Sequence, residues 1–271
     1  MLWNVDKKNL VPTIMQLVNE NKIDILALVE MEKSHNDYLI SELSKIDIRF
    51  KKHEVLKIEN GISLFGRENV KVSTLKEDNH YSVYKVYLEK ELILLFVVHL
   101  ASAMYKDEEA RNNRASSLSR IFEKIEAEVF GETDYKSIVI GDFNLNPFAT
   151  GIIGAYGFNA TLCLTKAKKK LRTVDGDKKL FYYNPMWRLM GKDEVVGGTY
   201  FNDSDQTDKS FYWYTFDQVL IRPGILEKFP LEQLKILNMV EGESLLSKHK
   251  IDKVKFSDHL PIKFEIREGE C

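Results

Sequence analysis

Short apolar runs that are nearly continuous restrict the fold of this chain more than any other feature. Residues 23–29, 92–98 and 138–140 are such runs. They have the length and composition of strands that are covered on both faces. Between them, residues 34–43 and 107–129 show helical spacing, and Asn9 is placed to cap a helix through Ile14 and Val18. This alternation predicts a mixed α/β chain with two sheets and helices on the outside.

Composition bounds the class of protein. The 271 residues are 44% hydrophobic, which indicates a globular chain, and we expect one domain over 1–271 with an irregular insertion at about 165–208. With 39 Lys+Arg against 41 Asp+Glu, the formal net charge of −2 excludes a general nucleic-acid coat but leaves room for a local basic groove.

Cysteine usage and the apolar segments bear on location. The two cysteines, Cys163 and Cys271, do not make a disulfide scaffold. The start of the chain lacks the pattern of a signal peptide, and the longest apolar run, 92–98, is too short to span a membrane. We therefore expect a cytoplasmic protein with no membrane partner.

Polar residues stand at or just past the ends of the apolar runs. They are Asn4, Glu30, Asp142, Asn144, Asp258 and His259. If the strand ends meet, these side chains form an acidic pocket with one titratable imidazole. Such a pocket suits a divalent cation and a phosphate ester.

The segment Gly141-Asp142-Phe143-Asn144 is the sharpest local signal. Gly141 lets the chain turn at the strand end, and Asp142 and Asn144 share a side because alternate residues of an extended segment share a face. A carboxylate beside an amide can orient a water and bind a phosphate oxygen. An Asx turn leading into Pro147 explains the same residues about equally well.

The other candidates are weaker when taken singly. Glu30 alone reads more readily as an exposed residue that opens a loop, and Asn4 as a turn or cap residue. His99, at the end of the run 92–98, is about an even choice between a core histidine and a functional one. Asp217 lies in an aromatic strand, where a buried carboxylate needs a partner, and the imidazole of His259 is the partner that we expect.

Two basic clusters and a set of aromatics are ambiguous. The clusters are Lys166, Lys168, Lys169, Lys170 and Arg172, and Lys248, Lys250, Lys253 and Lys255. Runs of this kind are usually solvated surface, although they could line an anionic groove. Aromatic residues between the two clusters, such as Trp187, Tyr200 and Trp213, can stack on bases, but packing in the hydrophobic core is the simpler explanation for them.

Taken together and in this order, the motifs at Trp3-Asn4, Glu30, Gly141–Asn144 and Ser257-Asp258-His259 resemble the endonuclease/exonuclease/phosphatase superfamily, the fold of deoxyribonuclease I. The resemblance covers nearly the whole chain. It implies a four-layered α/β sandwich and a Mg²⁺-dependent or Mn²⁺-dependent attack of water on a phosphoester.

The resemblance also implies a role for each matching residue. Asn4, Glu30 and Asp258 would lie at the metal. Asp142 and Asn144 would hold the attacking water and a phosphate oxygen. His259, oriented by Asp217, would act as general base or phosphate ligand.

Three features bear on the branch of the superfamily. His99 matches the histidine of the deoxyribonuclease-I and sphingomyelinase branches, where AP endonucleases place a tyrosine, which argues against a dedicated abasic-site enzyme. Only three residues precede Asn4, so either the first strand is clipped or the true start lies upstream. The Lys-rich segment 165–208 matches no substrate motif.

Three functions remain open from the sequence. The leading hypothesis is a metal-dependent phosphodiesterase that acts as a nuclease. A phosphatase or phosphodiesterase for a small or lipid-derived phosphoester is the nearest alternative, and the near-neutral charge favours it modestly. The third is a non-catalytic binding protein that keeps the fold, although the presence of all the polar residues counts against it.

Overall fold

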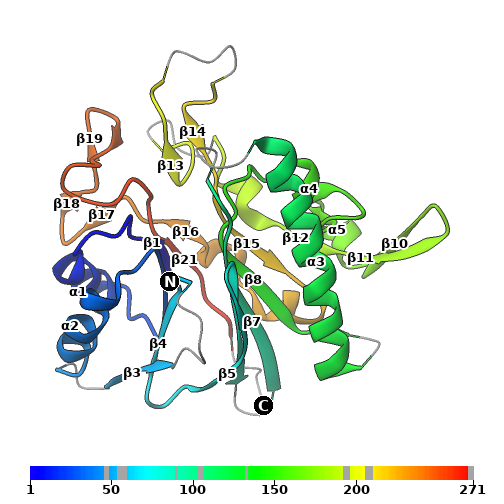
Figure 1. Ribbon diagram of the computed structural model, residues 1–271, viewed down its shortest axis with the longest axis horizontal. Coiled ribbons are helices and arrows are strands. Elements are labelled where there is room, and N and C mark those ends of the chain that lie inside the picture. The colour runs from blue at the N-terminus through cyan, green and yellow to red at the C-terminus, as the bar shows by residue number, and fades with distance from the viewer. Residues whose placement is uncertain are drawn as a thin grey trace.

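The computed structural model describes residues 1–45, 49–53, 60–88, 91–102, 107–131, 134–191, 196–204 and 210–267. Two large β-sheets lie against one another, and helices cover their outer faces (Figure 1). Helices α1 (Val11–Glu20) and α2 (Lys33–Leu43) cover one sheet, and α3 (Glu108–Phe130) covers the other. The four-layered α/β sandwich implied by the sequence is therefore confirmed.

The first sheet has six strands in the order β16-β21-β1-β2-β4-β3. The strands are β1 (Leu2–Asn4), β2 (Ile25–Val29), β3 (Phe50–His53), β4 (Ser63–Arg67), β16 (Lys235–Ile236) and β21 (Ile262–Lys263). Only the β1–β2 pair is parallel, with Leu2 opposite Ala27 and Asn4 opposite Val29. Because parallel strands end at the same edge, this register places Asn4 beside Glu30.

The second sheet has seven strands in the order β5-β6-β7-β8-β15-β12-β9. The strands are β5 (Lys71–Asp78), β6 (Tyr81–Leu88), β7 (Glu91–His99), β8 (Ser137–Asp142), β9 (Ala160–Thr161), β12 (Tyr182–Tyr183) and β15 (Asp217–Ile221). Parallel β7 and β8 end together, with His99 opposite Asp142. Antiparallel β15 begins at that edge, with Asp217 opposite Asp142.

Short strand pairs and short helices complete the fold around the two large sheets. The two-stranded pairs are β10 (Leu171–Val174) with β11 (Asp177–Leu180), β13 (Tyr200–Phe201) with β14 (Trp213–Tyr214), β17 (Met239–Val240) with β18 (Glu243–Ser244), and β19 (Leu246–Ser247) with β20 (Lys250–Ile251). The short helices are α4 (Thr150–Ile153), α5 (Leu164–Ala167), η1 (Pro185–Arg188), η2 (Pro223–Lys228) and η3 (Leu231–Gln233).

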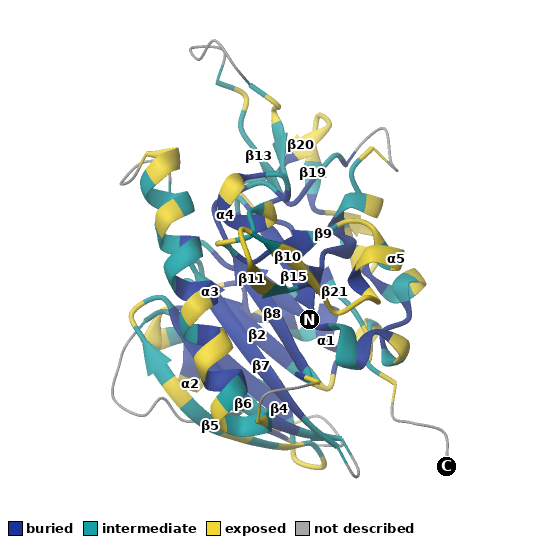
Figure 2. Ribbon diagram, turned by 90° about the vertical axis from the view of Figure 1, so that its right-hand side faces the viewer, coloured by how far each residue is buried: buried dark blue, intermediate teal, exposed yellow. Residues whose placement is uncertain are grey.

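Three hydrophobic cores fill the spaces between the four layers, and Figure 2 shows the buried sheets between exposed helical faces. Strand alternation divides each strand between two cores. Leu2 packs between the sheets and Trp3 packs under α1. Ile140 likewise packs between the sheets, while Val139 packs under α3. This two-sided burial is the physical reason for the continuous apolar runs in the sequence.

Several local predictions need correction. The N-cap position of α1 is Leu10 and not Asn9, although Asn9 Oδ1 accepts from the N–H of Val11, the first residue of the helix, at 3.5 Å. The sequence also predicts a single strand over 211–221, but this segment forms two strands, β14 and β15, which lie in different sheets. A further strand is predicted over 48–53; it begins at Phe50 among the described residues, and Ile48 lies outside them.

The segment 165–208, expected as an insertion, contributes β12 to the large sheet as well as the β10–β11 pair. Its residues 192–195 and 205–208 lie outside the described part. In the described ranges, no helix is both long and apolar enough to cross a membrane.

Candidate active site

The ends of strands from both sheets meet at one place. Asn4 and Glu30 come from the six-stranded sheet, and His99, Asp142 and Asp217 come from the seven-stranded sheet. Hydrogen bonds and ion pairs, described below, join these side chains with Asn144 and His259. The structure thus brings together seven of the eight predicted site residues, and the eighth, Asp258, lies at their edge.

Asn4 joins the two sheets through its side chain. Its Nδ2 donates to Glu30 Oε1 and to Asp142 Oδ2, at 3.1 Å in both cases. Its Oδ1 accepts from the backbone N–H of Asp6 at 3.0 Å. In this arrangement the amide of Asn4 holds the two carboxylates in place, and its oxygen is already engaged.

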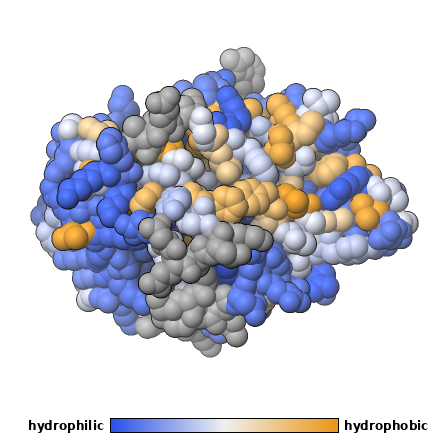
Figure 3. All heavy atoms as spheres, turned by 90° about the horizontal axis from the view of Figure 1, so that it is seen from above, coloured by the Kyte–Doolittle hydropathy of each residue, from blue (hydrophilic) through white to orange (hydrophobic). Residues whose placement is uncertain are grey.

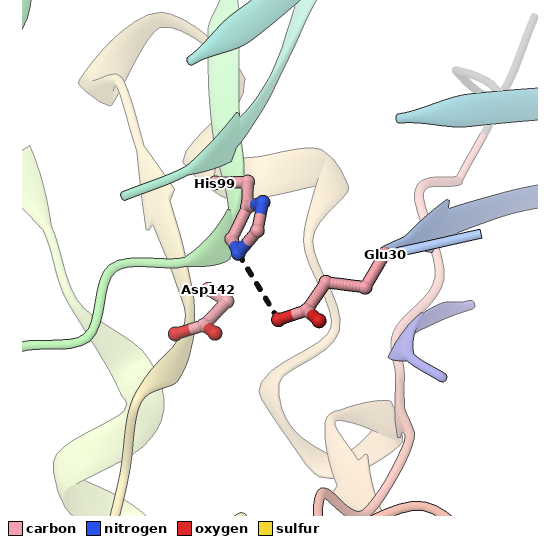
Figure 4. A group of neighbouring side chains, drawn as sticks. All are labelled: Glu30, His99 and Asp142. Atoms are coloured by element: carbon pink, nitrogen blue, oxygen red, sulfur yellow. Dashed lines mark ion pairs between the residues drawn. The ribbon is translucent and has the colours of Figure 1, made fainter. Parts of the chain in front are cut away.

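Glu30 and His99 form the most open pair of the site. His99 Nε2 lies 3.3 Å from Glu30 Oε1, and Figure 4 shows the two side chains pointing toward one another with Asp142 alongside. The hydrogen bond from His99 lowers the pKa of Glu30 to about 2. Burial lowers the pKa of His99, but the bond to Glu30 and the charge of Asp142 outweigh it, so that pKa is raised.

Glu30 also has a left-handed backbone, with φ of 55°. Such a conformation costs about 1–3 kcal/mol for a residue other than glycine and concentrates at functional sites. The backbone of the adjoining loop holds it, because Lys7 donates to the Glu30 carbonyl at 3.0 Å.

Asp142 and Asn144 make the Asx turn that the sequence allowed, and they still face the site together. The backbone N–H of Asn144 donates to Asp142 Oδ1 at 2.8 Å, and Asn144 Nδ2 donates to Asp142 Oδ2 at 2.9 Å. The two predictions for this motif are therefore not exclusive. Burial raises the pKa of Asp142 above its ordinary value, against the opposing charge of His259.

Gly141 has a different role from the one predicted. It is still part of β8, with φ of 148°, and does not form the turn. A Cβ built there would lie 2.0 Å from the carbonyl oxygen of Val98. Glycine is needed because β7 and β8 approach closely one residue before Asp142.

His259 and Asp217 form the buried pair that the sequence predicted. His259 Nδ1 lies 2.7 Å from Asp217 Oδ2, and the ring is 5% exposed. Burial alone would lower the pKa of His259, but Asp217 and then Asp142 raise it to about 10. With Nδ1 on Asp217, Nε2 faces the site, 3.8 Å from Asp142 Oδ2.

The loop that carries His259 is tied to β1. Ser257 Oγ donates to the Asn4 carbonyl at 2.6 Å and accepts from the His259 N–H at 3.1 Å, and Trp3 Nε1 donates to the His259 carbonyl at 2.8 Å. Asp258 is partly exposed, and its Oδ1 lies 3.9 Å from His259 Nε2. Burial raises the pKa of Asp258.

Three contacts of the site were not foreseen. For Arg111, the sequence favours a solvated helix face over a phosphate contact, but in the structure this side chain of α3 donates to the Asn144 carbonyl. Thr199 Oγ1 accepts from the Asp217 N–H at 3.1 Å. The ring of Tyr200 lies 4.9 Å from that of His259. Arg111 stands three residues inside a capped helix, but nothing in the sequence pairs it with Asn144, 33 residues on.

The donor set fits a divalent cation. Glu30, His99 and Asp142 each offer a ligand atom within 4.8 Å of the others. Glu30 is ionised and its side chain is 24% exposed, so a cation can reach it. Carboxylates are the ligands that Mg²⁺ and Mn²⁺ prefer.

Comparisons with known proteins bear on the fold. No protein-family model matches the sequence, and no curated protein matches it. Solved structures do match over nearly the whole chain. A humanized D. rerio TDP2 with 14 mutations is 16% identical, with a TM-score of 0.58, over 98% of this chain and 97% of that one.

Two further structures come from microorganisms. An AP endonuclease from Archaeoglobus fulgidus is 12% identical, with a TM-score of 0.58, over 98% of this chain and 97% of that one. An endonuclease/exonuclease/phosphatase family protein from Leptotrichia buccalis is 14% identical, with a TM-score of 0.55, over 98% of each chain. Identities this low bear on the fold, and it is the one that the sequence motifs predicted. This chain has the fold of the endonuclease/exonuclease/phosphatase superfamily.

Proposed function

We propose that this protein is a divalent-metal-dependent phosphodiesterase that acts on nucleic acid as a nuclease, with Mg²⁺ or Mn²⁺ as its cofactor. The observation that carries the proposal is the meeting of Glu30, His99, Asp142, Asn144 and the His259–Asp217 pair at one edge of two sheets. The solved structures of similar fold support it, since they include AP endonuclease and TDP2 with a single-stranded DNA product.

Glu30 would hold the cation, with Asn4 and Asp258 as the further ligands expected from the sequence; the Asn4 oxygen accepts from the Asp6 N–H and keeps a second lone pair for a cation. The structure adds His99 and Asp142 as candidates, because both lie within reach of Glu30. When bound, the cation would neutralise phosphate charge and stabilise the leaving oxygen.

His259 and Asp142 would act as the proton donor and the proton acceptor of the reaction. The Asp217 carboxylate accepts from Nδ1 of His259, which leaves Nε2 directed at the site. A raised pKa favours a protonated ring that donates to a phosphate oxygen. Asp142 is then the group positioned to take a proton from the attacking water, and Asn144 the group that orients it.

The test is hydrolysis of four substrates by purified protein with Mg²⁺, with Mn²⁺ and with excess EDTA. The substrates are supercoiled plasmid, single-stranded DNA, RNA and an aryl phosphodiester. Glu30→Gln should lose roughly 10²-fold or more in kcat with the fold intact. Glu32→Gln is the matched control, since Glu32 lies two residues away with a side chain that is 51% exposed.

Each result separates the hypotheses. Metal-dependent cleavage of nucleic acid that falls in Glu30→Gln and not in Glu32→Gln supports the proposal. Cleavage of the aryl ester alone would redirect it to small or lipid-derived phosphoesters. No cleavage, with metal-independent binding, would replace it by a binding protein of the same fold.

A further inference from the structure

Four aromatic side chains lie in a row outside the active site. The ring centroids are 5.9 Å apart between Tyr214 and Phe211, 5.6 Å between Phe211 and Phe148, and 5.8 Å between Phe148 and Trp187. We call these four residues the outer aromatic strip. They come from the loop after β8, from η1, and from β14 and the residues just before it, so the fold gathers them from three separate segments.

The strip does not belong to the hydrophobic cores. None of its four members is in the three core clusters or packed against them, whereas Phe201 and Trp213 are. Phe211 is 61% exposed, and the other three are partly exposed. Packing in the hydrophobic core, which is the simpler explanation from the sequence, therefore does not account for these rings. The face seen from above also shows apolar side chains gathered near its middle (Figure 3).

The strip is continuous with the active site. Tyr214 lies 5.0 Å from Phe216 and 6.3 Å from Tyr200, measured between ring centroids. Tyr200 in turn lies 4.9 Å from the ring of His259. An extended ligand with one end at His259 would therefore pass along the rings toward Trp187.

The chemistry of the strip favours bases. Aromatic rings suit stacking, and stacking tolerates any base because every base has a π-face. Cations stand at both ends for a phosphate backbone: Lys253 Nζ lies 5.1 Å from the Tyr200 ring centroid, and the exposed Arg188 follows Trp187. A duplex would keep its base faces stacked on one another, so the ligand must be unpaired there.

We propose that the outer aromatic strip binds unpaired bases of a nucleic-acid strand, beyond the nucleotide whose phosphate lies at His259. This inference rests on the proposed function, because it names the substrate class as a single strand several nucleotides long. The binding itself needs no turnover and can be measured without it.

The test is fluorescence anisotropy with a labelled oligothymidylate of about ten nucleotides in EDTA. Phe211→Ala and Phe148→Ala should each raise Kd about tenfold, the loss of one base stacked on an aromatic ring. Phe211→Tyr should keep the wild-type affinity, whereas Phe211→Leu should not. The control is Tyr38→Ala on α2, since Tyr38 is also exposed, at 47%, and lies outside the strip.

A second ligand separates stacking from charge. An oligonucleotide of equal length with abasic positions keeps every phosphate, so its Kd should be weaker in the wild type and insensitive to Phe211→Ala. Equal affinity for both ligands, or equal affinity of Phe211→Leu and Phe211→Tyr, would overturn the inference and leave an apolar peptide as the alternative occupant. The four-substrate assay of the wild type reports on the hydrolase proposal independently: base stacking on the strip with no cleavage of any of the four substrates would overturn that proposal alone.

Discussion

The substitution Asp217→Asn tests whether the Asp217 carboxylate raises the pKa of His259. Among the described residues, His259 is the hydrogen-bond partner of Asp217 Oδ2, at 2.7 Å, and the buried Oδ1 has none. Replacing the carboxylate by an amide keeps the volume and removes the charge. The change therefore acts chiefly on His259, where Asp217 is the largest influence that raises the pKa.

The structure sets the size of the effect. The pKa of His259 stands at about 10 against an ordinary 6.5, a net difference, after the opposing effect of burial, equivalent to roughly 5 kcal/mol. Without Asp217, its charge and its hydrogen bond no longer raise the pKa of His259 while burial still lowers it, so that pKa falls. We expect kcat to fall by about 10²–10⁴, the usual contribution of one positioned acid or base.

The free energy of unfolding should change over the same pH range in which His259 loses its proton. A raised folded-state pKa gives stabilisation that is complete below pH 6.5 and disappears as the pH rises to about 10. In EDTA, the wild type should exceed Asp217→Asn in free energy of unfolding at pH 6, and the difference should shrink by pH 10. Denaturant titrations measure this, and NMR titration of the ring, assigned with His259→Ala, gives the pKa directly.

The reasoning would be refuted by a stability difference that does not change with pH. It would fail equally if the variant kept a His259 pKa near that of the wild type, or lost less than about tenfold in kcat.

Three further predictions follow from single contacts. Glu30→Gln should abolish Mg²⁺ or Mn²⁺ binding measured by calorimetry, because Glu30 is the ionised and exposed carboxylate of the cluster; undiminished binding would move the metal elsewhere. Gly141→Ala should lower stability by roughly 3 kcal/mol, since the added Cβ meets a backbone carbonyl of β7 at 2.0 Å; a melting temperature within a degree or so of wild type would contradict this. Arg111→Ala should lower kcat about tenfold by releasing the Asn144 carbonyl, whereas the exposed Arg120→Ala on α3 should not.

The sequence predicted the frame of the fold because burial on both faces leaves a strong pattern. Strands β2, β7 and β8 are nearly uniform in apolar character, and the polar residue that ends each one stands out. The edge strand β5 has exposed and half-buried residues and left no such pattern. The break between β14 and β15 was missed because the chain changes sheets within an aromatic run, and composition does not register that change.

The residue types of the candidate site were predictable from the sequence, but the orientation of their side chains was not. Asp217 was paired with His259 because a buried carboxylate needs a partner, and the pair lies at 2.7 Å. The position of the Asn4 amide between Glu30 and Asp142 depends on the packing of two sheets, which no local pattern encodes. Arg111 was misread for the same reason, since its partner is set by the placement of α3.

The site spans the boundary between the two sheets, and for this reason many of its polar side chains form hydrogen bonds within the protein. Asn4 and Ser257 bond across to neighbouring strands and loops, and the amide of Asn4 holds the carboxyl groups of Glu30 and Asp142 close together. Two carboxylates at this distance repel, and the apolar core between the sheets must supply the opposing free energy. A bound cation would relieve the repulsion. The same geometry would then give the site its affinity for a divalent ion under the proposed function, and any change that lets the two sheets separate should weaken ion binding before it disturbs either sheet.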